Sequence, residues 1–461
     1  MAPATRFRGF PTMSVPAVLV ISTVTLLLLA RAMAQSDPSF PDPCQGSTYT
    51  PSDNLPYGRH TFPPGFVFGT AASAYQEDIQ RMKYMNVDAY RLSISWSRVI
   101  PYGKRSTGVN REGLDFYHKV IDLLKHNGIE PYVTIWHWDT PQALEAEYGG
   151  FLSRDIVKDF EDYCDLLFEE YGKKITKWIT LNEPVTYVMR GYDEGLMAPG
   201  RCSTYMDPIT YGHYPRNMID LVGSRLPTFT SEESRSLKGS YDFLGLNYYT
   251  AYYSMNNTNF DPEHLEYLKD SHAITTATGA NGELIGPELG TSWQYLYPQG
   301  LQYLLNYTKD TYRNPHIYIT ENGLSQLDDP TQSIDEATQD DDRINFYDTH
   351  LDSVLQSMIG YNVNVSGFFA WSLADNYEWN DGYSVRFGFY YIDYTDGHLT
   401  RYPKSSACWY TNFLNWNAPT GQTLIRQKNV RSNNKLQARS ARHSAAAGGR
   451  RALPARRFSR W

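Results

Sequence analysis

Two glutamates stand directly after runs of strand-forming residues, and each lies beside an asparagine. Residues 177–187 read KWITLNEPVTY, a predicted buried strand that ends on Asn182 and Glu183. Residues 317–324 read IYITENGL, a second strand that ends on Glu321 and Asn322. Acetal hydrolysis needs one carboxylic acid to protonate the leaving oxygen and one carboxylate to meet the oxocarbenium ion. A single such glutamate is better explained as a solvated strand end, but two in the same context favour a catalytic pair.

Strands and helices alternate along the part of the chain that carries these glutamates. We predict strands at residues 66–75, 89–96, 131–138, 177–184, 241–250, 317–323 and 365–373. We predict helices at residues 77–86, 111–128, 154–172, 214–223, 298–313, 343–361 and 405–416. This order predicts an α/β fold with parallel strands. Most strand ends carry polar or aromatic residues, which favours a (β/α)₈ TIM barrel over a doubly wound sheet, whose ligand gathers at one switch point.

The predicted barrel is incomplete. Between Pro184 and Tyr241 an eight-stranded barrel needs a helix, a strand and another helix, yet we find one helix and no strand. The fifth strand and the fourth helix are therefore not readable in the sequence. Seven strands cannot close an eight-stranded barrel without a substitute, because strand number, shear and tilt are linked.

Several motifs resemble glycoside hydrolase family 1, and more narrowly the plant β-glucosidases. They are TLNEP, YITENG, FVFGTAASAYQ, AYRLSISWSRV, TIWHWDTPQAL, DFLGLNYYT and GFFAWSLADNYEWNDGYSVRFGFYYID, between about residues 37 and 416. The resemblance implies a TIM barrel that hydrolyses terminal non-reducing β-D-glucosyl residues with retention of configuration. Aromatic residues make up 15% of the chain, which suits stacking on sugar rings, although large α/β cores also use aromatics.

The resemblance also assigns roles to residues. Glu183 matches the acid/base, and Glu321 matches the nucleophile, supported by Arg91 and Tyr249. Retention requires the two carboxyl groups to lie about 5 to 5.5 Å apart. Two carboxyl groups at that distance cannot both ionise freely, so one of them is held protonated. The implied glucose-binding residues are Gln76, His137, Asn182, Tyr249, Trp371, Glu378, Trp379 and Phe387, and Trp293 matches a position beside the aglycone. Taken singly, Trp371 or His137 is better explained as a core residue.

The chain departs from the family in two places. After Gln76 a long loop is missing, and after Ser203 a disulfide loop, a helix, a strand and a further loop are missing. Cys202 matches a cysteine whose partner would lie in the second missing segment. Every catalytic residue named above survives. We therefore interpret the chain as an exon-skipped or mispredicted form of a β-glucosidase gene.

The two ends of the chain have different compositions from the middle. Residues 1–34 have the basic, apolar and small-residue regions of a signal peptide, and residues 35–60 form a Pro-rich arm. The barrel domain is predicted at residues 61–418. Residues 419–461 form a basic tail, with 11 Lys or Arg and no Asp or Glu from residue 421 onward, which predicts disorder. The secretory route leads to the cell wall, the extracellular space or the vacuole.

The glycosylation triplets agree with secretion, and the cysteines leave their pairing open. The four cysteines Cys44, Cys164, Cys202 and Cys408 allow three pairings, and their spacing does not resemble a zinc site. Cys164 and Cys408 lie in apolar helical patterns, which predicts small buried side chains. Glycosylation candidates are Asn256, Asn306 and Asn364. We expect no metal or cofactor, no nucleic acid, and no membrane contact after signal removal. The expected partner is a β-glucoside or a short β-linked oligosaccharide.

Three classes of function remain open. The first is a β-glucosidase or its close variant, a transglucosidase in which an alcohol replaces water. A thioglucosidase is disfavoured because that lineage replaces the acid by Gln and here Glu183 is present. The second is a sugar-binding relative without turnover, and the third is an inactive truncated product. The natural aglycone is left open.

We predict that the chain expressed as written is inactive or insoluble, because the exposed strand edges beside the gap favour aggregation. Soluble expression and an assay with a chromogenic aryl β-glucoside check this. Hydrolysis by soluble protein that Glu321→Ala abolishes would overturn the prediction. Sequencing of transcripts across Gln76–Glu77 and Ser203–Thr204 tests the interpretation of the gene.

Overall fold

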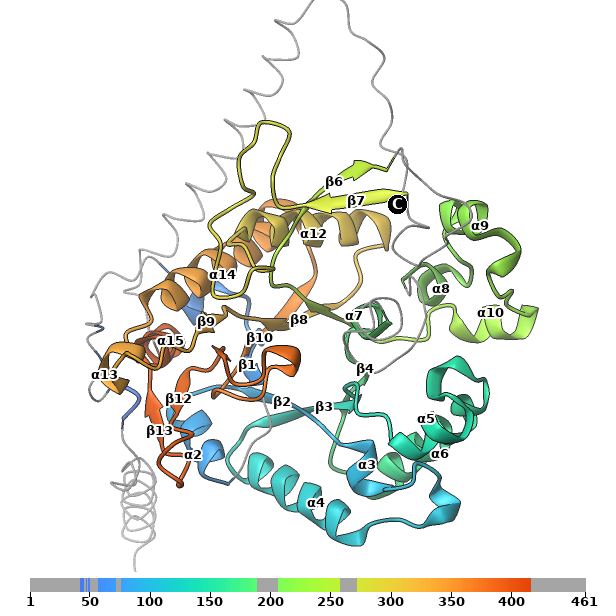
Figure 1. Cartoon of the computed structure of the whole chain (residues 1–461), viewed down its shortest axis with the longest axis horizontal. Helices are drawn as coiled ribbons and strands as arrows, with labels where there is room; N and C mark the ends of the chain where they lie inside the picture. Colours follow the sequence, from blue (N-terminus) through green and yellow to red (C-terminus); the bar gives the residue numbers. More distant parts are fainter. Residues whose placement is uncertain are drawn as a thin grey trace, which may run out of the picture. The chain divides into compact units, whose positions relative to one another are not determined.

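A seven-stranded parallel sheet organises the structure (Figure 1). Its hydrogen-bonded order is β4-β3-β2-β1-β10-β8-β5. The strands are β1 (Val67–Ala71), β2 (Ala89–Ser93), β3 (Glu130–Trp136), β4 (Lys177–Leu181), β5 (Leu244–Asn247), β8 (Ile317–Asn322) and β10 (Val365–Trp371). This computed structural model describes residues 42–44, 47, 49, 57–71, 76–188, 206–257 and 272–415. All seven strands predicted from the sequence are confirmed.

The sheet is rolled so that side chains from distant strands meet inside it. Tyr132 on β3 contacts Phe369 on β10 with ring centroids 4.8 Å apart, and Tyr318 on β8 at 5.3 Å. Together with Ala89 these residues form a buried cluster separate from the larger core. Strand β3 is not a neighbour of β8 or β10 in the sheet, so its contacts with both identify this cluster as the interior of a nearly closed barrel.

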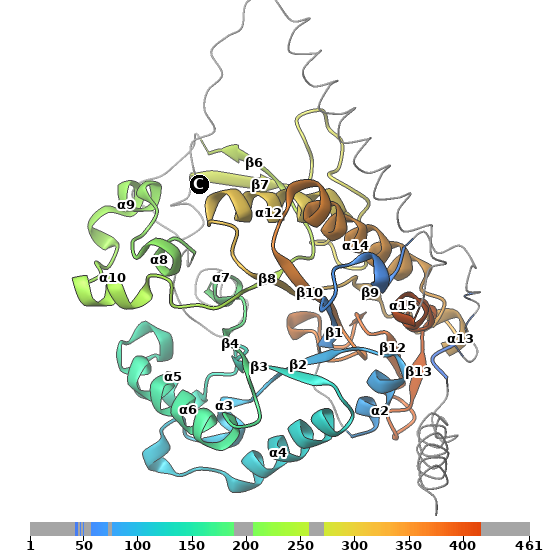
Figure 2. The ribbon, with the colours of Figure 1, turned by 180° about the vertical axis from the view of Figure 1, so that it is seen from behind.

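The larger core lies between the outer face of the sheet and the helices, which surround it in Figures 1 and 2. The main helices are α2 (Gln76–Tyr84), α4 (Arg111–His126), α6 (Asp155–Tyr171), α12 (Pro298–Thr311), α14 (Asp341–Tyr361) and α15 (Ser405–Asn415). Shorter helices are α3 (Trp96–Val99), α5 (Gln142–Tyr148), α7 (Pro184–Val188) and α13 (Ile334–Ala337). The amphipathic pattern of α4 buries Leu114, Ile121 and Leu124 on one face, as its apolar spacing predicts.

Small antiparallel pairs lie outside the barrel. They are β6 (Tyr253–Asn256) with β7 (Ala273–Thr276), β9 (Gln326–Leu327) with β11 (Val385–Arg386), and β12 (Tyr390–Ile392) with β13 (Arg401–Pro403). The second and third pairs belong to the connections that follow β8 and β10. They form backbone hydrogen bonds within and between the loops that follow the carboxyl ends of those two strands.

The barrel is open between β4 and β5. Within the residues that the structure describes, no strand pairs with the outer edge of either one. Both edge strands are correspondingly less buried than their neighbours. In β4 Thr180 is exposed and in β5 Gly245 is exposed, whereas every residue of β8 is buried. The gap predicted from counting strands is therefore confirmed for the described part of the chain.

Helices, not a strand, occupy the described residues between β4 and β5. Besides α7, they are α8 (Met206–Tyr211), α9 (Arg216–Val222) and α10 (Ser231–Leu237), and Figures 1 and 2 show these three beside one another at one side of the sheet. The sequence predicted only α9. It missed α10, although Thr230 and Glu233 form a capping box at its start. The helix is short and has no buried residue, so it lacks the apolar period on which the prediction relied.

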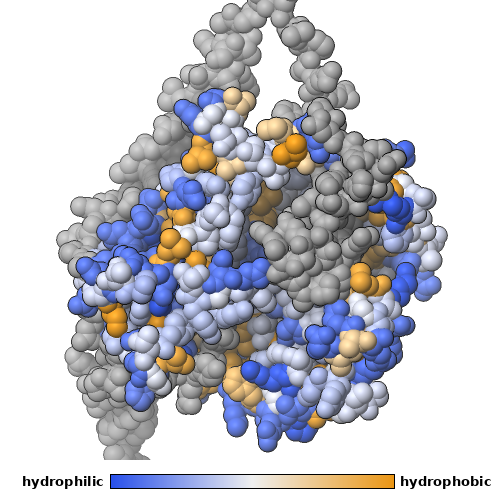
Figure 3. All heavy atoms as spheres, viewed as in Figure 1, coloured by the Kyte–Doolittle hydropathy of each residue, from blue (hydrophilic) through white to orange (hydrophobic). Residues whose placement is uncertain are grey.

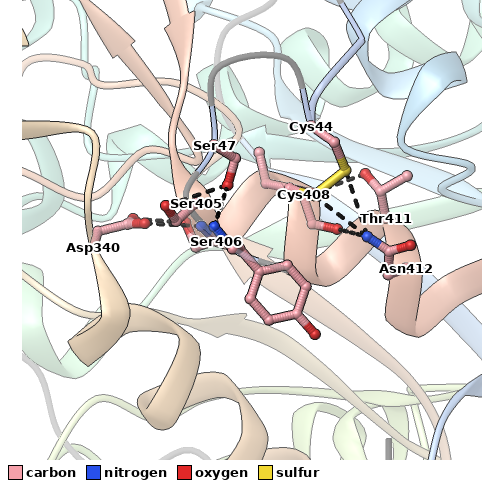
Figure 4. Close-up of a disulfide and its surroundings, with 10 residues drawn as sticks. Cys44, Ser47, Asp340, Ser405, Ser406, Cys408, Thr411 and Asn412 are labelled. Atoms are coloured by element: carbon pink, nitrogen blue, oxygen red, sulfur yellow. Dashed lines mark hydrogen bonds between the residues drawn. A yellow bond between two sulfur atoms is a disulfide. The ribbon is translucent and has the colours of Figure 1, made fainter. Parts of the chain in front are cut away.

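A disulfide joins the N-terminal arm to the last helix. Cys44 bonds to Cys408 on α15, with Cα atoms 4.5 Å apart (Figure 4). Beside it Ser406 donates to Asp340, at 2.6 Å from hydroxyl to carboxylate. The prediction that Cys408 is only a small buried side chain is thus wrong, because the arm folds back onto α15 and brings a second thiol to it. Cys164 is half-buried and free, and Cys202 lies outside the described residues.

The predicted signal peptide and basic tail also lie outside the described residues. Among the helices that the structure describes, none combines the length and apolar character needed to span a bilayer. The described surface in Figure 3 is mainly hydrophilic, with apolar residues in small separate groups.

We expect backbone amides of β4 and β5 to exchange with deuterium faster than those of β8 and β10. Alternate N–H groups of each edge strand face the gap without a strand partner, and local opening is easier where contacts are few. Hydrogen–deuterium exchange measured by mass spectrometry on peptic peptides checks this, with β3 as the internal control. Equal protection of β4 and β3 would show that the gap is closed in solution.

Candidate active site

The carboxyl ends of the seven parallel strands bring the predicted site residues together at one end of the barrel. Parallel strands in a barrel all point the same way, so their last residues meet at one rim. Strand β2 contributes Arg91, the end of β4 contributes Asn182 and Glu183, and β8 contributes Glu321. Each comes from a different part of the sequence. Their assembly was expected from the strand pattern and is seen in the structure.

Arg91 links these strands across the barrel. It is 3% exposed, and its guanidinium donates to three different strands. Nη1 donates to Oε1 of Glu321, and Nη2 lies 2.6 Å from Oδ1 of Asn182. Nε donates to Oγ1 of Thr134 on β3 at 3.1 Å. The fork geometry of a guanidinium suits this role, because it fixes several acceptors at once.

Glu321 is held by two donors. Besides Arg91, the Tyr249 hydroxyl donates to its Oε2 at 2.7 Å. Glu321 is 4% exposed, so these contacts replace water around the carboxylate. Burial raises the pKa of Tyr249 well above its ordinary value, and nearby Glu321 raises it further, so its proton remains available to donate. A buried carboxylate with a cation on one oxygen and a donor on the other is oriented for attack.

Glu183 has the opposite environment. Burial of its carboxyl raises the pKa to about 7, and the charge of Glu321 adds to the increase. Its backbone φ of +37° is uncommon for a residue other than glycine, and it turns the chain directly into α7. Pro184 begins that helix, where a missing N–H costs nothing. The result is a carboxyl group that keeps most of its proton below pH 7 and is about half ionised at neutral pH.

Asn247 is a functional residue that the sequence analysis missed. Its Nδ2 donates to Oε1 of Glu183 at 2.7 Å, and it lies 3.3 Å from Oδ1 of Asn182. Its Oδ1 accepts a hydrogen bond from Thr320 at 2.7 Å. Since Asn247 ends β5 and Glu183 follows β4, these bonds cross the place where the barrel is open. The signal that could have found it is an asparagine at a strand end, the pattern already used for Asn182 and Asn322.

Asn182 and His137 form a second pair of neighbours. Asn182 Nδ2 and His137 Nε2 lie 3.1 Å apart, and Trp138 Nε1 donates to the Asn182 carbonyl at 2.9 Å. Burial lowers the pKa of His137 to about 4. The imidazole is therefore neutral at neutral pH and can exchange hydrogen bonds with a hydroxyl.

The loop after β10 supplies the aromatic wall. Trp371 Nε1 donates to Oε1 of Glu378 at 3.3 Å, and burial raises the pKa of Glu378 to about 8. Trp379 stacks on His137 with ring centroids 5.8 Å apart. Phe387 meets Tyr249 edge to face at 6.0 Å. Trp371 ends β10, and Glu378, Trp379 and Phe387 follow it in the chain.

A cavity of about 150 Å³ opens among these side chains. Its lining residues are Arg91, Leu92, Ser93, Thr134, His137, Trp371, Asn376, Tyr377 and Trp379. This volume is below the range of about 300 to 1,000 Å³ for drug-sized ligands, so it suits one small ring. A larger cavity of about 360 Å³ lies beside Asp340 and Arg343 and includes none of the predicted site residues.

The remaining predicted residues lie farther out. Gln76 begins α2, and its side chain is outside the described part of the structure. Trp293 meets Tyr249 edge to face at 6.1 Å, on the β5 side of the site. Asn256 and Asn364 are exposed, whereas Asn306 is half-buried on α12. In the described ranges no group of three His, Cys, Asp or Glu side chains could hold a metal ion.

A barrel whose rim pairs a protonated carboxyl with a carboxylate beside an aromatic-walled cavity defines a glycosidase. A family model described as glycosyl hydrolase family 1 matches residues 74–205 and 201–419. The chain belongs to glycosyl hydrolase family 1, whose members are retaining O-glycosyl hydrolases.

Curated relatives are plant enzymes. β-Glucosidase 24 of Oryza sativa subsp. japonica is 43% identical, over 74% of this chain and 82% of the relative. The isoflavonoid 7-O-β-apiosyl-glucoside β-glycosidase of Dalbergia nigrescens is 40% identical, over 78% of this chain and 86% of the relative. Among solved structures, a rice β-glucosidase matches with a TM-score of 0.74 and 36% identity, over 78% of this chain and all of that one.

The alignment with β-glucosidase 24 includes positions that have no counterpart in this chain. The 417 positions aligned with β-glucosidase 24 cover 74% of this chain, about 341 residues, so about 76 positions of the relative have no counterpart here. The family match itself breaks at residues 201–205. That break lies between β4 and β5, the two strands that flank the opening in the sheet.

We expect Asn247→Ala to raise the pKa of Glu183, because the hydrogen bond that this substitution removes stabilises the ionised carboxylate. A charge-assisted bond of this kind corresponds to roughly one pKa unit. The alkaline limb of kcat/KM, where Glu183 loses its proton, should therefore move upward by up to about that amount. The pH profile with an aryl β-glucoside measures this shift.

Asn364→Ala is the matched control, because Asn364 is exposed and distant from the rim. An alkaline limb that stays in place in Asn247→Ala, or that moves downward, would contradict the role of Asn247. A fall in kcat/KM at every pH without any shift would mean that Asn247 only supports the fold.

Proposed function

We propose that the protein hydrolyses terminal non-reducing β-D-glucosyl residues from β-glucosides by a retaining double displacement. One observation carries the proposal. Two neighbouring carboxyl groups have opposite environments, since Glu183 has a pKa raised to about 7 while Glu321 accepts hydrogen bonds from Arg91 and Tyr249. The carboxyl group whose environment favours the protonated form suits the role of acid. The one whose environment favours the ionised form suits the role of nucleophile.

In the first step Glu321 attacks the anomeric carbon and Glu183 gives its proton to the leaving oxygen. The C–O bond to the aglycone breaks and a glucosyl ester forms on Glu321. That ester removes the negative charge that helped raise the pKa of Glu183. The carboxylate of Glu183 then takes a proton from water, whose oxygen attacks the anomeric carbon and releases Glu321.

The surrounding side chains fit a glucose ring. Asn182 is placed by Arg91 and Asn247 beside both carboxyl groups, where it can bond the 2-hydroxyl in the transition state. His137, Glu378 and Trp379 line the side that would receive the 3-, 4- and 6-hydroxyls, and Trp371 offers its ring as a platform. These assignments rest on the family resemblance together with the positions of the side chains.

Two alternatives concern the same site. A transglucosidase would use an alcohol in place of water, and the described residues do not distinguish the two acceptors. An inactive truncated product would follow if the open sheet prevented folding. Asn247 on β5 bonds to Glu183 across the opening. Arg91 bonds to both Asn182 and Glu321 from inside the barrel. We therefore propose, in place of the inactive or insoluble chain expected from the sequence alone, that the missing strand lowers stability and leaves the catalytic arrangement intact.

The terminal segments support a secretory location as part of this proposal. An apolar leader, a disulfide between Cys44 and Cys408 and the exposed acceptors Asn256 and Asn364 all suit an oxidising compartment. We propose the cell wall, the extracellular space or the vacuole, and a β-glucoside or short oligosaccharide as the partner.

Substitution of each glutamate should change kcat in a different way for substrates with good and poor leaving groups. Glu321→Ala removes the nucleophile and should lower kcat by on the order of 10⁴-fold for every β-glucoside. Glu183→Gln removes the acid and should spare activated aryl glucosides in the first step, because their leaving groups need little protonation. Comparison of nitrophenyl and alkyl β-glucosides measures the difference.

Proton NMR of the first product supplies the stereochemical test. Release of β-glucose before mutarotation supports the double displacement, and release of α-glucose would rule it out. Glu288→Gln serves as the matched control, because Glu288 is exposed and lies by the larger cavity away from the rim. Equal losses in Glu288→Gln and Glu321→Ala would show that the assay reports folding and not chemistry.

A further inference from the structure

Gln294 is a fully buried polar side chain that the reaction described above does not use. It lies in the connection between β7 and α12. Its Nε2 donates to the carbonyl of Gly323 at 2.6 Å and to the carbonyl of Tyr249 at 3.3 Å. Its Oε1 accepts hydrogen bonds from the backbone N–H of Ser325 at 2.8 Å and from the Ser325 hydroxyl at 2.7 Å. A glutamine amide has two donor hydrogens and two acceptor lone pairs, so all of them are used.

The partners of Gln294 belong to the two strand ends that carry the nucleophile and its donor. Gly323 and Ser325 follow Glu321 at the end of β8. Tyr249 comes two residues after the end of β5, and its hydroxyl donates to Oε2 of Glu321 at 2.7 Å. Gln294 therefore joins the segment that carries Glu321 to the segment that carries Tyr249.

This link is important because β5 is an edge strand. In the described part of the chain β5 pairs with β8 alone, and its other edge faces the opening in the sheet. Just beyond β5, the Tyr248 N–H donates to the carbonyl of Glu321 at 3.0 Å, and Asn322 Nδ2 donates to the carbonyl of Tyr248 at 2.6 Å. Gln294 adds the next bond along this segment, at the carbonyl of Tyr249. It thus extends the attachment to β8 as far as the residue that donates to the nucleophile.

The surroundings of Gln294 favour a fixed geometry. Its backbone N–H donates to the carbonyl of Thr291 at 3.1 Å, and the Thr291 N–H donates to the Ser325 hydroxyl at 3.0 Å. Thr291 and Ser325 are both buried. The preceding residue, Trp293, meets the ring of Tyr249 edge to face at 6.1 Å. A buried polar network whose members are all paired is rigid, because no water is at hand to exchange partners.

We propose that Gln294 is a positioning residue of the reaction, which holds the Tyr249 hydroxyl on Glu321 and so keeps the carboxylate aligned for attack. The inference rests on the proposed function and deepens it. Gln294 acts on Glu321 through Tyr249 and Gly323. A displacement of a reacting group by about 1 Å can lower a rate by roughly 100-fold, so a residue outside the cavity can control the chemical step.

Gln294→Met keeps the length of the side chain and removes its four hydrogen bonds. We expect kcat for p-nitrophenyl β-glucoside to fall by about 10- to 100-fold while KM changes by less than about threefold, because the nucleophile is misaligned and the cavity is unaltered. The acidic limb of kcat/KM, where Glu321 takes up a proton, should move to higher pH by up to about one unit, because Tyr249 then stabilises the ionised carboxylate less. Gln299→Met, exposed at the start of α12, is the matched control and should change neither quantity.

A double substitution separates positioning from support of the fold. In a Tyr249→Phe background Gln294→Met should add no further shift of the acidic limb, because the hydrogen bond that Gln294 places is already absent. A further shift of the same size would overturn the proposal, as would an acidic limb that stays in place in folded Gln294→Met. If Gln294→Met does not fold, Gln294→Glu replaces it. A buried neutral carboxyl has one donor for two carbonyl groups, so it must release Tyr249 or Gly323, and we expect a smaller shift in the same direction.

Carbon-13 NMR of protein labelled at tyrosine Cζ separates failure of this inference from failure of the proposed function. The Tyr249 signal is identified by its loss in Tyr249→Phe, and it reports the hydrogen bond to Glu321 without any substrate. Gln294→Met should shift this signal, whereas Gln299→Met should not. If the unaltered protein hydrolyses no β-glucoside but the signal shifts, the proposed function fails and the positioning of Tyr249 by Gln294 stands. A signal that does not move in folded Gln294→Met would rule out that positioning whatever the activity.

Discussion

The arrangement of the site depends on one buried cation. Arg91 lies inside the barrel and donates to Glu321, Asn182 and Thr134, which belong to three other parts of the sheet. A buried guanidinium is stable only when its donors are matched, so each partner fixes the others. Removing it would leave Glu321 as an uncompensated charge in a desolvated pocket. Glu321, Asn182 and the alignment of β2, β3, β4 and β8 therefore form one structural unit.

A second constraint is the open edge of the sheet. An eight-stranded barrel removes all strand edges, whereas this sheet leaves the outer edges of β4 and β5 without strand partners in the described residues. Asn247 bonds to Glu183 and Asn182 across that opening, at the level of the chemistry. Side chains thus connect the two edge strands where backbone hydrogen bonds do not. The open edge therefore affects the packing of β4 and β5, while these side-chain hydrogen bonds hold Glu183, Asn182 and Asn247 together at the rim.

The loops after β8 and β10 carry the rest of the site on rigid supports. Arg343 is fully buried and donates to the carbonyl groups of Leu324 and Phe387, which joins the two loops. Asp375 holds the β10 loop through Arg386 and Lys404. Catalytic side chains on loops are effective only when such contacts remove alternative conformations.

The strand pattern predicted the seven strands, the main helices and the gap, and the chemistry of the strand ends singled out Glu183 and Glu321, because these features are local and leave a readable period. The sequence analysis did not single out Asn247, because only the contact across the gap distinguishes this strand-end asparagine from others. It also misjudged Cys408, because pairing with Cys44 requires the N-terminal arm to return to α15 over 364 residues of sequence. The pKa of Glu183 was likewise decided only by tertiary structure, since desolvation and the nearby charge of Glu321 exist only once distant segments meet.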